Sequence, residues 1–147
     1  MRVAIVTESF LPNINGVTNS VLRTMEQLSN SGDQVLVIAP AAANTPATYV
    51  GHPVKTVPVI NTQNFLPTGM PMGLPQKRIK HLIDGFAPDV IHLASPFALC
   101  SYANKIAKLL NITCVSIYQT DLGGFAKQYG FGIAQNSLQK ILYKIHS

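Results

Sequence analysis

The first part of the chain alternates an apolar run, a polar loop and a helical stripe. Residues 3–6 form a short apolar run, and a polar, proline-bearing loop follows that closes on Asn15 and Gly16. From Val17 to residues 31–32 the apolar side chains recur at helical spacing. The pattern predicts a strand, a loop and a helix, and the free N–H groups and dipole of such a helix start can stabilise phosphate.

Gly16 is the expected pivot of this turn. Because glycine has no Cβ, it can take a positive φ and lets another group approach the backbone closely. A tight turn also needs glycine for steric reasons alone, so this residue by itself does not establish a ligand site.

Two more strands are predicted next. Residues 34–39 are nearly all apolar and rich in β-branched side chains, which suits a parallel strand that is covered on both faces. A dinucleotide-binding domain would carry Asp or Glu near the end of this strand, and only alanine and proline occur there, which argues against NAD. We predict a loop over residues 40–53 and a strand over residues 54–60, near a sheet edge because Pro58 interrupts it.

Residues 61–74 contain two prolines and two glycines and are predicted to be a surface loop, of a length that often serves a site. From Pro75 the apolar positions become helical, and the rest of the circumference is basic, with Lys77, Arg78 and Lys80. Periodicity alone indicates a solvated face on a helix that packs against the core.

The second half repeats the strand, turn and helix order. Residues 89–93 are predicted as a strand with a structural histidine, His92, inside it, and residues 94–96 as the turn into a helix. Residues 113–118 form the next predicted strand, and a polar, glycine-bearing turn follows at residues 119–124. A last apolar stripe runs from Leu138 to Ile145.

Strands and helices therefore alternate, which predicts an α/β fold with a three-layer, Rossmann-like parallel sheet. Ligands of open α/β sheets bind outside the carboxyl ends of the strands. We expect the turns at residues 8–16, 94–96 and 119–124 to face one cleft.

Composition narrows the class of protein. A chain of 147 residues with 47% apolar content can bury one core, and 12% charged residues leave a weakly charged surface that hints at contact with a partner or second domain. The net charge of +5 favours anionic ligands, and no cluster of basic and aromatic residues typical of nucleic-acid binding occurs.

Cys100 and Cys114 form no metal motif and are expected to be free thiols in a reducing compartment. We expect no signal peptide and no membrane-spanning segment.

Three blocks, Glu8–Val21 (ESFLPNINGVTNSV), His92–Phe97 (HLASPF) and Tyr118–Gly130 (YQTDLGGFAKQYG), resemble the N-terminal half of family 4 glycosyltransferases. Within that family the chain is most similar to actinobacterial GDP-mannose-dependent α-mannosyltransferases that act on glycolipids, relatives of the phosphatidylinositol mannosyltransferases. The resemblance implies the N-terminal half of a GT-B fold, whose two Rossmann-like domains face each other across a cleft, and a metal-independent transfer that retains anomeric configuration.

The resemblance also implies roles for individual residues. Gly16 and the amides around it would meet the donor diphosphate, flanked by Asn15 and Thr18, and would stabilise the leaving group as an oxyanion site does. Ser95 is expected either to face the cleft or to have a purely structural role.

Many family members carry His where this chain has Gln119, and Gln can position a sugar hydroxyl but cannot carry a proton at neutral pH. Asp121 would contact an acceptor hydroxyl and Thr120 would lie beside it, although both could simply cap the next helix. Related lipid mannosyltransferases reach anionic membrane through a basic amphipathic helix of this domain, a role that would fall to Lys77, Arg78 and Lys80.

These inferences give residues 1–147 as the acceptor-side domain of a retaining hexosyltransferase, with the donor-binding domain absent and the isolated chain inactive. The expected donor is GDP-mannose and the acceptor a lipid-linked or small sugar, with no metal, no other cofactor and no nucleic acid. The expected location is the cytoplasm, with peripheral contact to the inner face of the cell membrane as an option. The alternatives are a family 4 transferase that uses UDP-glucose or UDP-N-acetylglucosamine, and a nucleotide-binding module without catalysis.

Overall fold

The structure is a computed structural model of the chain, and it describes residues 1–60 and 72–117. Its elements in chain order are β1 (Arg2–Val6), α1 (Gly16–Asn30), β2 (Gln34–Pro40), β3 (Thr48–Tyr49), β4 (His52–Val57), β5 (Val59–Ile60), β6 (Met72–Gly73), α2 (Lys77–Phe86), β7 (Val90–Leu93), α3 (Ala98–Leu110) and β8 (Thr113–Ser116). The predicted alternation of strands and helices is confirmed for the described residues.

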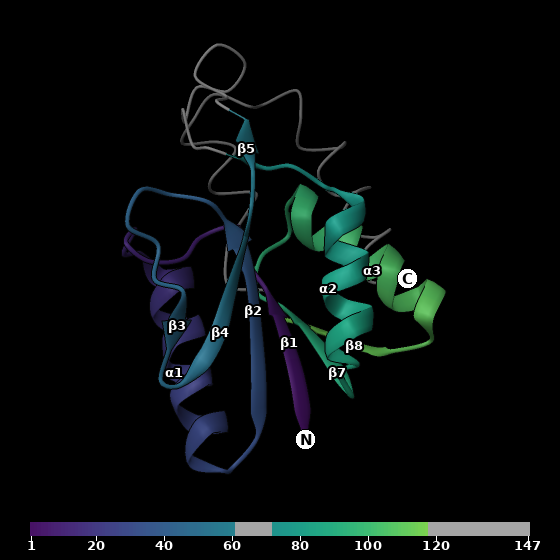
Figure 1. Ribbon diagram of the computed structural model, residues 1–147, viewed down its shortest axis with the longest axis horizontal. Helices are drawn as coiled ribbons and strands as arrows, with labels where there is room; N and C mark the ends of the chain where they lie inside the picture. The colour runs from purple at the N-terminus through teal and green to yellow at the C-terminus, as the bar shows by residue number, and fades with distance from the viewer. Residues whose placement is uncertain (61–71, 118–147) are drawn as a thin grey trace.

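The sheet has six strands in the order β3-β4-β2-β1-β7-β8, and all neighbours are parallel except the β3–β4 pair (Figure 1). Successive strands run outward from β1 through β2 to β4 on one side, and from β7 to β8 on the other. The strand order therefore reverses between β1 and β7, and in open α/β sheets the crevice at such a reversal is the usual ligand site.

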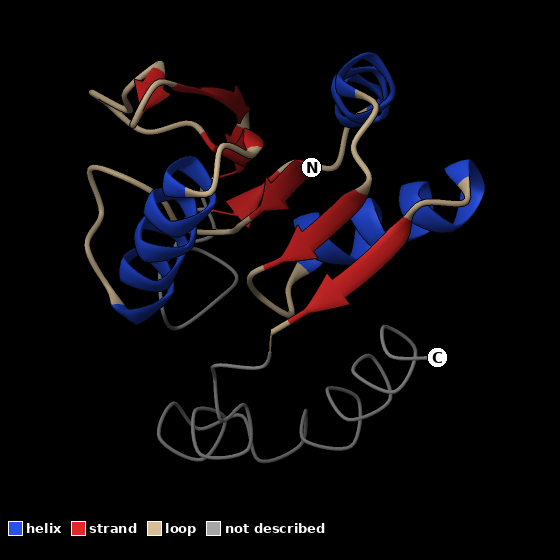
Figure 2. Ribbon diagram, turned by 90° about the horizontal axis from the view of Figure 1, so that it is seen from below, coloured by secondary structure: helices blue, strands red, loops and turns tan. Residues whose placement is uncertain are grey.

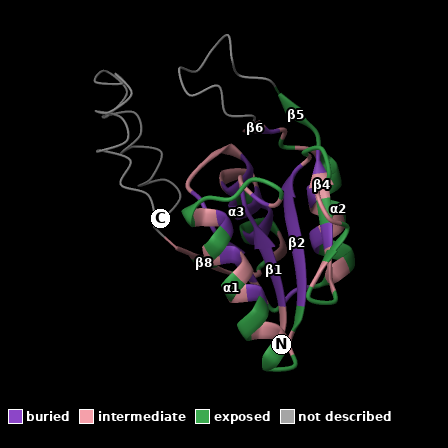
Figure 3. Cartoon of the chain, turned by 90° about the vertical axis from the view of Figure 1, so that its left-hand side faces the viewer, coloured by how far each residue is buried: buried purple, intermediate pink, exposed green. Residues whose placement is uncertain are grey.

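Helices cover both faces of the sheet, as the three-layer prediction requires (Figure 2). On one face Val21 and Met25 of α1 pack into a cluster with Ile5 and Val37 of the central strands. On the other face α2 and α3 pack over a second cluster that includes Ile38. Strands β1 and β2 lie between the two clusters and are almost wholly buried, which explains their nearly continuous apolar sequence (Figure 3).

The predicted loop over residues 40–53 is wrong in its second half. Thr48–Tyr49 forms a short antiparallel edge strand, and β4 begins at His52 rather than residue 54. The sequence did not predict the first residues of β4 because Pro53 has no N–H to donate to a neighbouring strand. In the structure Pro53 pairs with Thr48 of the edge strand β3.

The predicted strand over residues 54–60 divides at Pro58. Residues up to Val57 pair with β2, whereas Val59–Ile60 pairs with Met72–Gly73 in a separate two-stranded sheet. The Pro58 carbonyl accepts a hydrogen bond from the Leu74 N–H at 2.8 Å, so the chain turns away from the main sheet at this residue. The predicted position of this strand near the sheet edge is correct.

The helix boundaries follow local chemistry. Helix α1 ends at Asn30 with Ser31 as its C-cap, and Gly32 then takes a left-handed φ of 78°. The predicted strand over residues 113–118 ends at Ser116 among the described residues. The predicted stripe from Leu138 to Ile145 and most of the predicted loop over residues 61–74 lie outside the described residues. Within the described part of the chain, no helix is both long and apolar enough to cross a membrane.

Candidate functional site

Two of the three predicted turns meet at the carboxyl edge of the sheet, where the strand order reverses. The Glu8 N–H donates a hydrogen bond to Ser95 Oγ at 3.0 Å, which joins the loop after β1 to the loop after β7. The Ala94 N–H also donates to the Val6 carbonyl at 3.0 Å. These two loops therefore lie in contact, as a shared cleft would require, and the shared cleft itself stays a prediction. The third turn at residues 119–124 lies outside the described residues.

The loop after β1 is held in place by side chains around the start of α1. Asn15 is the N-cap, and its Oδ1 accepts a hydrogen bond from the Thr18 N–H at 2.9 Å. The Asn15 Nδ2 donates to Ser9 Oγ at 2.7 Å, and Ser9 Oγ lies 3.0 Å from the buried Thr18 Oγ1. The structure thus gives Asn15 and Thr18 supporting positions beside Gly16, because their polar atoms are already engaged within the loop.

Gly16 does not use the positive φ that glycine allows, but its backbone is accessible. It is the first residue of α1 and does not have the positive φ that the sequence interpretation allowed. It is exposed, and a Cβ added to it would meet no atom within 4 Å. Neither the backbone conformation at Gly16 nor its neighbours therefore require glycine. The open space beside its backbone is available to a ligand that approaches the N-terminus of α1 closely.

The N–H groups at this end of α1 are partly unused. The Thr18 N–H bonds to Asn15 Oδ1 and the Asn19 N–H bonds to the Asn15 carbonyl at 2.9 Å. The N–H groups of Gly16 and Val17 have no hydrogen-bond partner within residues 1–60 and 72–117. Two free donors at the positive end of a helix dipole suit an anionic oxygen.

Ser95 lies at the centre of the contact between the two loops. It is buried, and its Oγ both accepts the Glu8 N–H and lies 3.5 Å from Cys100 Sγ. Cys100 Sγ in turn donates to the Val6 carbonyl at 3.2 Å. Burial, with Glu8 nearby, raises the pKa of the Cys100 thiol to about 12, so this cysteine is an inert, protonated part of the core.

Glu8 is the residue of this site that the sequence interpretation left without a role. Its Oε1 accepts hydrogen bonds from the N–H groups of Leu99 at 2.5 Å and Cys100 at 3.3 Å, in the first turn of α3. Its Oε2 is shielded from solvent and has no hydrogen-bond partner. Desolvation raises the pKa of Glu8 to about 7, although the backbone N–H groups of Leu99, Cys100 and, from β6, Gly73 act in the opposite direction.

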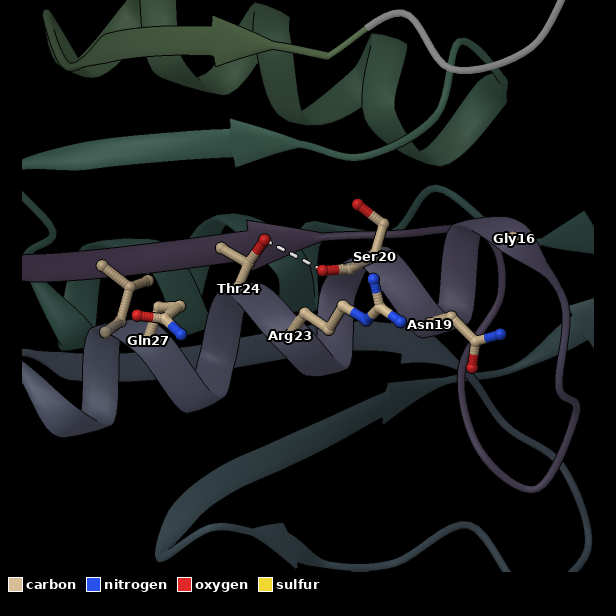
Figure 4. Close-up of a pocket in the computed structure, with 7 residues that line it drawn as sticks. Gly16, Asn19, Ser20, Arg23, Thr24 and Gln27 are labelled. Carbon is tan, nitrogen blue, oxygen red and sulfur yellow. Dashed lines mark hydrogen bonds between the residues drawn. The ribbon is translucent and has the colours of Figure 1, made fainter.

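A shallow, open hollow of about 630 Å³ lies along α1 from Gly16 toward Leu28, and every described residue that lines it belongs to this helix. Figure 4 shows Asn19, Arg23 and Gln27 along this face, and the Thr24 hydroxyl turned back to the Ser20 carbonyl, to which it donates at 2.9 Å. Arg23 is the only charged residue among those lining it, so the described wall is polar and weakly cationic.

The predicted basic helix is α2, on the sheet face opposite α1. Lys77 and Arg78 are exposed, whereas Lys80 is partly buried and its Nζ lies 4.0 Å from Asp84 Oδ2. The apolar stripe of this helix is fully buried at Ile79 and Ile83. The side chains that face solvent are therefore the charged ones, and the apolar face is already committed to the core.

The structure does not place every predicted site residue. Gln119, Thr120 and Asp121 lie outside the described residues, so their roles remain predictions. His92 is buried within β7, as expected of a histidine inside a strand, and burial lowers its pKa.

The sequence of the chain identifies its family. The pattern of Glycosyltransferase Family 4 matches residues 14–146. The chain belongs to glycosyltransferase family 4. It is 44% identical over 150 aligned positions to a GDP-mannose-dependent alpha-mannosyltransferase of Mycolicibacterium smegmatis, covering all of this chain and 40% of that protein. It is 46% identical over 132 positions to a protein of the same name from Corynebacterium glutamicum, covering 88% of this chain and 32% of that protein. The chain thus spans well under half the length of these relatives.

Solved structures confirm the fold. The chain superposes with a TM-score of 0.52 on the glycosyltransferase SsfS6 of Streptomyces sp. SF2575, at 15% identity and over 79% of this chain and 38% of that one. It superposes with a TM-score of 0.53 on the lipopolysaccharide outer core galactosyltransferase WaaB, at 14% identity and over 79% of this chain and 32% of that one. The Rossmann-like α/β architecture expected of the N-terminal half of a GT-B fold is therefore present.

Proposed function

We propose that this chain is the N-terminal, acceptor-side domain of a retaining α-mannosyltransferase that moves mannose from GDP-mannose to a glycolipid acceptor. The observation that carries the proposal is the identity of 44–46% to GDP-mannose-dependent alpha-mannosyltransferases over nearly the whole chain. The donor-binding domain would lie in a further part of the protein, since the matched relatives are more than twice as long as this chain.

In this proposal the N-terminus of α1 receives the diphosphate of the donor. The free N–H groups of Gly16 and Val17 and the helix dipole would stabilise the negative charge that develops on the departing nucleotide. The open space above Gly16 would let a phosphate oxygen approach the backbone, and the Asn15 cap would hold these donors in place before the donor arrives. Charge stabilisation of this kind needs no metal ion, so we propose a metal-independent transfer.

The basic face of α2 is proposed to contact anionic lipid near the acceptor. Because the apolar stripe of α2 is buried in the core, this contact would be electrostatic rather than insertion into the bilayer. Each Lys or Arg near an anionic surface contributes on the order of 1 kcal/mol, so Lys77 and Arg78 would give a weak attachment that salt releases.

The test compares the isolated chain with the two-domain protein in assays with GDP-mannose, UDP-glucose and UDP-N-acetylglucosamine and a diacylglycerol-based acceptor. We expect the two-domain protein to transfer mannose and the isolated chain to be inactive, because positioning of donor and acceptor between two domains can account for roughly 7–11 kcal/mol of barrier lowering. Transfer of glucose or N-acetylglucosamine instead would assign another donor. Comparable turnover by the isolated chain would refute the two-domain assignment, and no transfer at all would favour a nucleotide-binding module.

A further inference from the structure

We propose that Glu8 is a positioning residue of the transfer reaction: its carboxylate fixes the N-terminus of α3 to the end of β1 and so sets the spacing of the two loops that carry Gly16 and Ser95. The inference rests on the proposed function, because it takes Gly16 to meet the donor of that reaction; the loop of Ser95 contacts the loop that leads to Gly16 at the same edge of the sheet.

The residue at the N-cap position of α3 supplies no capping side chain. Phe97 occupies the N-cap position in an extended conformation, and it has no side chain that could accept a hydrogen bond from the first turn. The missing acceptor comes from Glu8, 91 residues earlier in the chain, which receives the N–H groups of Leu99 and Cys100 on Oε1. A carboxylate at this position also interacts favourably with the positive end of the α3 dipole.

The segment after β1 and the segment around the start of α3 both donate and both accept hydrogen bonds. These bonds together fix the position and the orientation of one segment relative to the other. While the Glu8 carboxylate caps α3, the Glu8 backbone N–H is capped by Ser95 Oγ from the loop that precedes α3. Cys100, which donates one of the amides, also donates its thiol to the Val6 carbonyl at the end of β1. Three hydrogen-bonded connections thus join the end of β1 to the start of α3 at the point where the strand order reverses.

Stability alone does not account for this arrangement. A Ser or Asp at position 97 would cap α3 locally without burying a remote carboxylate. Glu8 instead carries a solvent-shielded Oε2 without a hydrogen-bond partner, and no cationic side chain forms an ion pair with it in the described part of the chain. A desolvated carboxylate without an ion-pair partner costs free energy even when amides donate to one of its oxygens, and such costs are typical of residues retained for function rather than for stability.

The protonation state of Glu8 controls how firmly it holds α3. The ionised carboxylate makes stronger hydrogen bonds to amides than the neutral acid does. The titratable side chain that faces Glu8 from α3 is Cys100, whose pKa of about 12 keeps it neutral; Gly73 of β6 and Ser95 of the β7–α3 loop do not titrate. Within residues 1–60 and 72–117, Glu8 is therefore the group of this cluster that changes charge near pH 7, where burial has placed its pKa.

Asp89 provides a matched control at the other end of the same strands. Its Oδ2 accepts a hydrogen bond from the Arg2 N–H at 2.7 Å, so it also joins β1 to the region of β7 through a carboxylate and a backbone amide. Asp89 precedes β7 and Arg2 begins β1, which places this contact at the amino edge of the sheet, away from the crevice. Asp89→Asn removes a comparable charge without altering the proposed site.

The experiment measures kcat and KM for GDP-mannose from pH 6 to pH 9 in the two-domain protein and its Glu8→Gln, Glu8→Asp and Asp89→Asn variants. Wild-type kcat is expected to rise through about pH 7, where Glu8 ionises. Glu8→Gln is expected to lose this rise and to lower kcat at pH 8 by about 10- to 100-fold with little change in KM, as misplacement of a reacting group does. Asp89→Asn is expected to keep both the wild-type kcat and the wild-type profile. Hydrogen exchange at the Leu99 and Cys100 amides is expected to be faster in Glu8→Gln than in Asp89→Asn.

Wild-type kcat in folded Glu8→Gln, or equal losses in Glu8→Gln and Asp89→Asn, would overturn the inference and leave the proposed function intact. If Glu8→Gln does not fold, Glu8→Asp decides: the shorter carboxylate should keep the pH profile and lower kcat, whereas unchanged kcat would contradict the positioning role. A wild-type protein that transfers no sugar from any nucleotide donor would instead refute the proposed function, on which the inference rests.

Discussion

The buried carboxylate of Glu8 makes the stability of this domain depend on pH. Desolvation raises its pKa from 4.5 to about 7, so the folded protein binds a proton over a range in which the unfolded chain has lost it. The contribution of the protonated Glu8 side chain to the free energy of unfolding is fully present below pH 4.5 and is lost as the pH rises to 7. At about 1.4 kcal/mol for each pKa unit, the loss is about 3 kcal/mol.

Glu8→Gln isolates this contribution because glutamine resembles the protonated acid and does not titrate. As the pH rises from 4 to 8, the unfolding free energy of Glu8→Gln should therefore increase by about 3 kcal/mol relative to that of the wild type. The difference is needed because burial lowers the pKa of His92, which gives a pH dependence of opposite sign below about pH 6.5. His92 is present in both proteins, so its contribution cancels.

The assay is urea unfolding of the chain followed by far-UV circular dichroism at several pH values. A difference between Glu8→Gln and wild type that stays constant from pH 4 to pH 8 would refute the reasoning, because it would mean that Glu8 titrates alike in the folded and unfolded chain. A difference that shifts in favour of wild type would show that the α3 amides outweigh desolvation and place the pKa of Glu8 below 4.5.

Two further predictions concern the start of α1 and the basic face of α2. Asn15→Ala should lower the unfolding free energy in urea by about 1 kcal/mol because the cap of α1 is lost, whereas Asn19→Ala on the exposed face should not; equal effects would contradict the capping role. Lys77→Glu combined with Arg78→Glu should abolish co-sedimentation with vesicles that contain anionic lipid, and wild-type binding should weaken with salt. Charge reversal at Lys105 on α3 serves as the control, and binding that survives the double reversal on α2 would refute membrane contact through this helix.

The sequence predicted those parts of the fold that depend on local pattern. The central strands were predictable because burial on both faces demands an unbroken apolar run, and α1 because one face must cover the sheet. Strand β4 was predicted only in part, since His52 and Pro53 suggest a loop, and their place in the sheet depends on pairing with Tyr49 and Thr48. The local sequence contains no signal for that pairing.

The candidate site was predictable to a similar extent. The position of Gly16 at a helix start follows from the strand, loop and helix pattern, and a Cβ added there would meet no atom within 4 Å. The contact between Glu8 and α3 joins residues 91 positions apart, so no local pattern could show it. The available signal was weak: a carboxylate directly after a buried strand, together with an apolar Phe97 where α3 needs a capping side chain.

The central claim, that the N-terminus of α1 receives the donor diphosphate, is tested most directly by Gly16→Val in the two-domain protein. A Cβ at Gly16 meets nothing within 4 Å, and the same is true of Gly85 in α2, so Gly85→Val is a control with equal steric freedom at the position of the added Cβ. We predict that both variants fold, that Gly85→Val transfers mannose from GDP-mannose at nearly the wild-type rate, and that Gly16→Val loses about 100-fold or more in turnover. Turnover by folded Gly16→Val equal to that of Gly85→Val would contradict the assignment of this helix start to the donor.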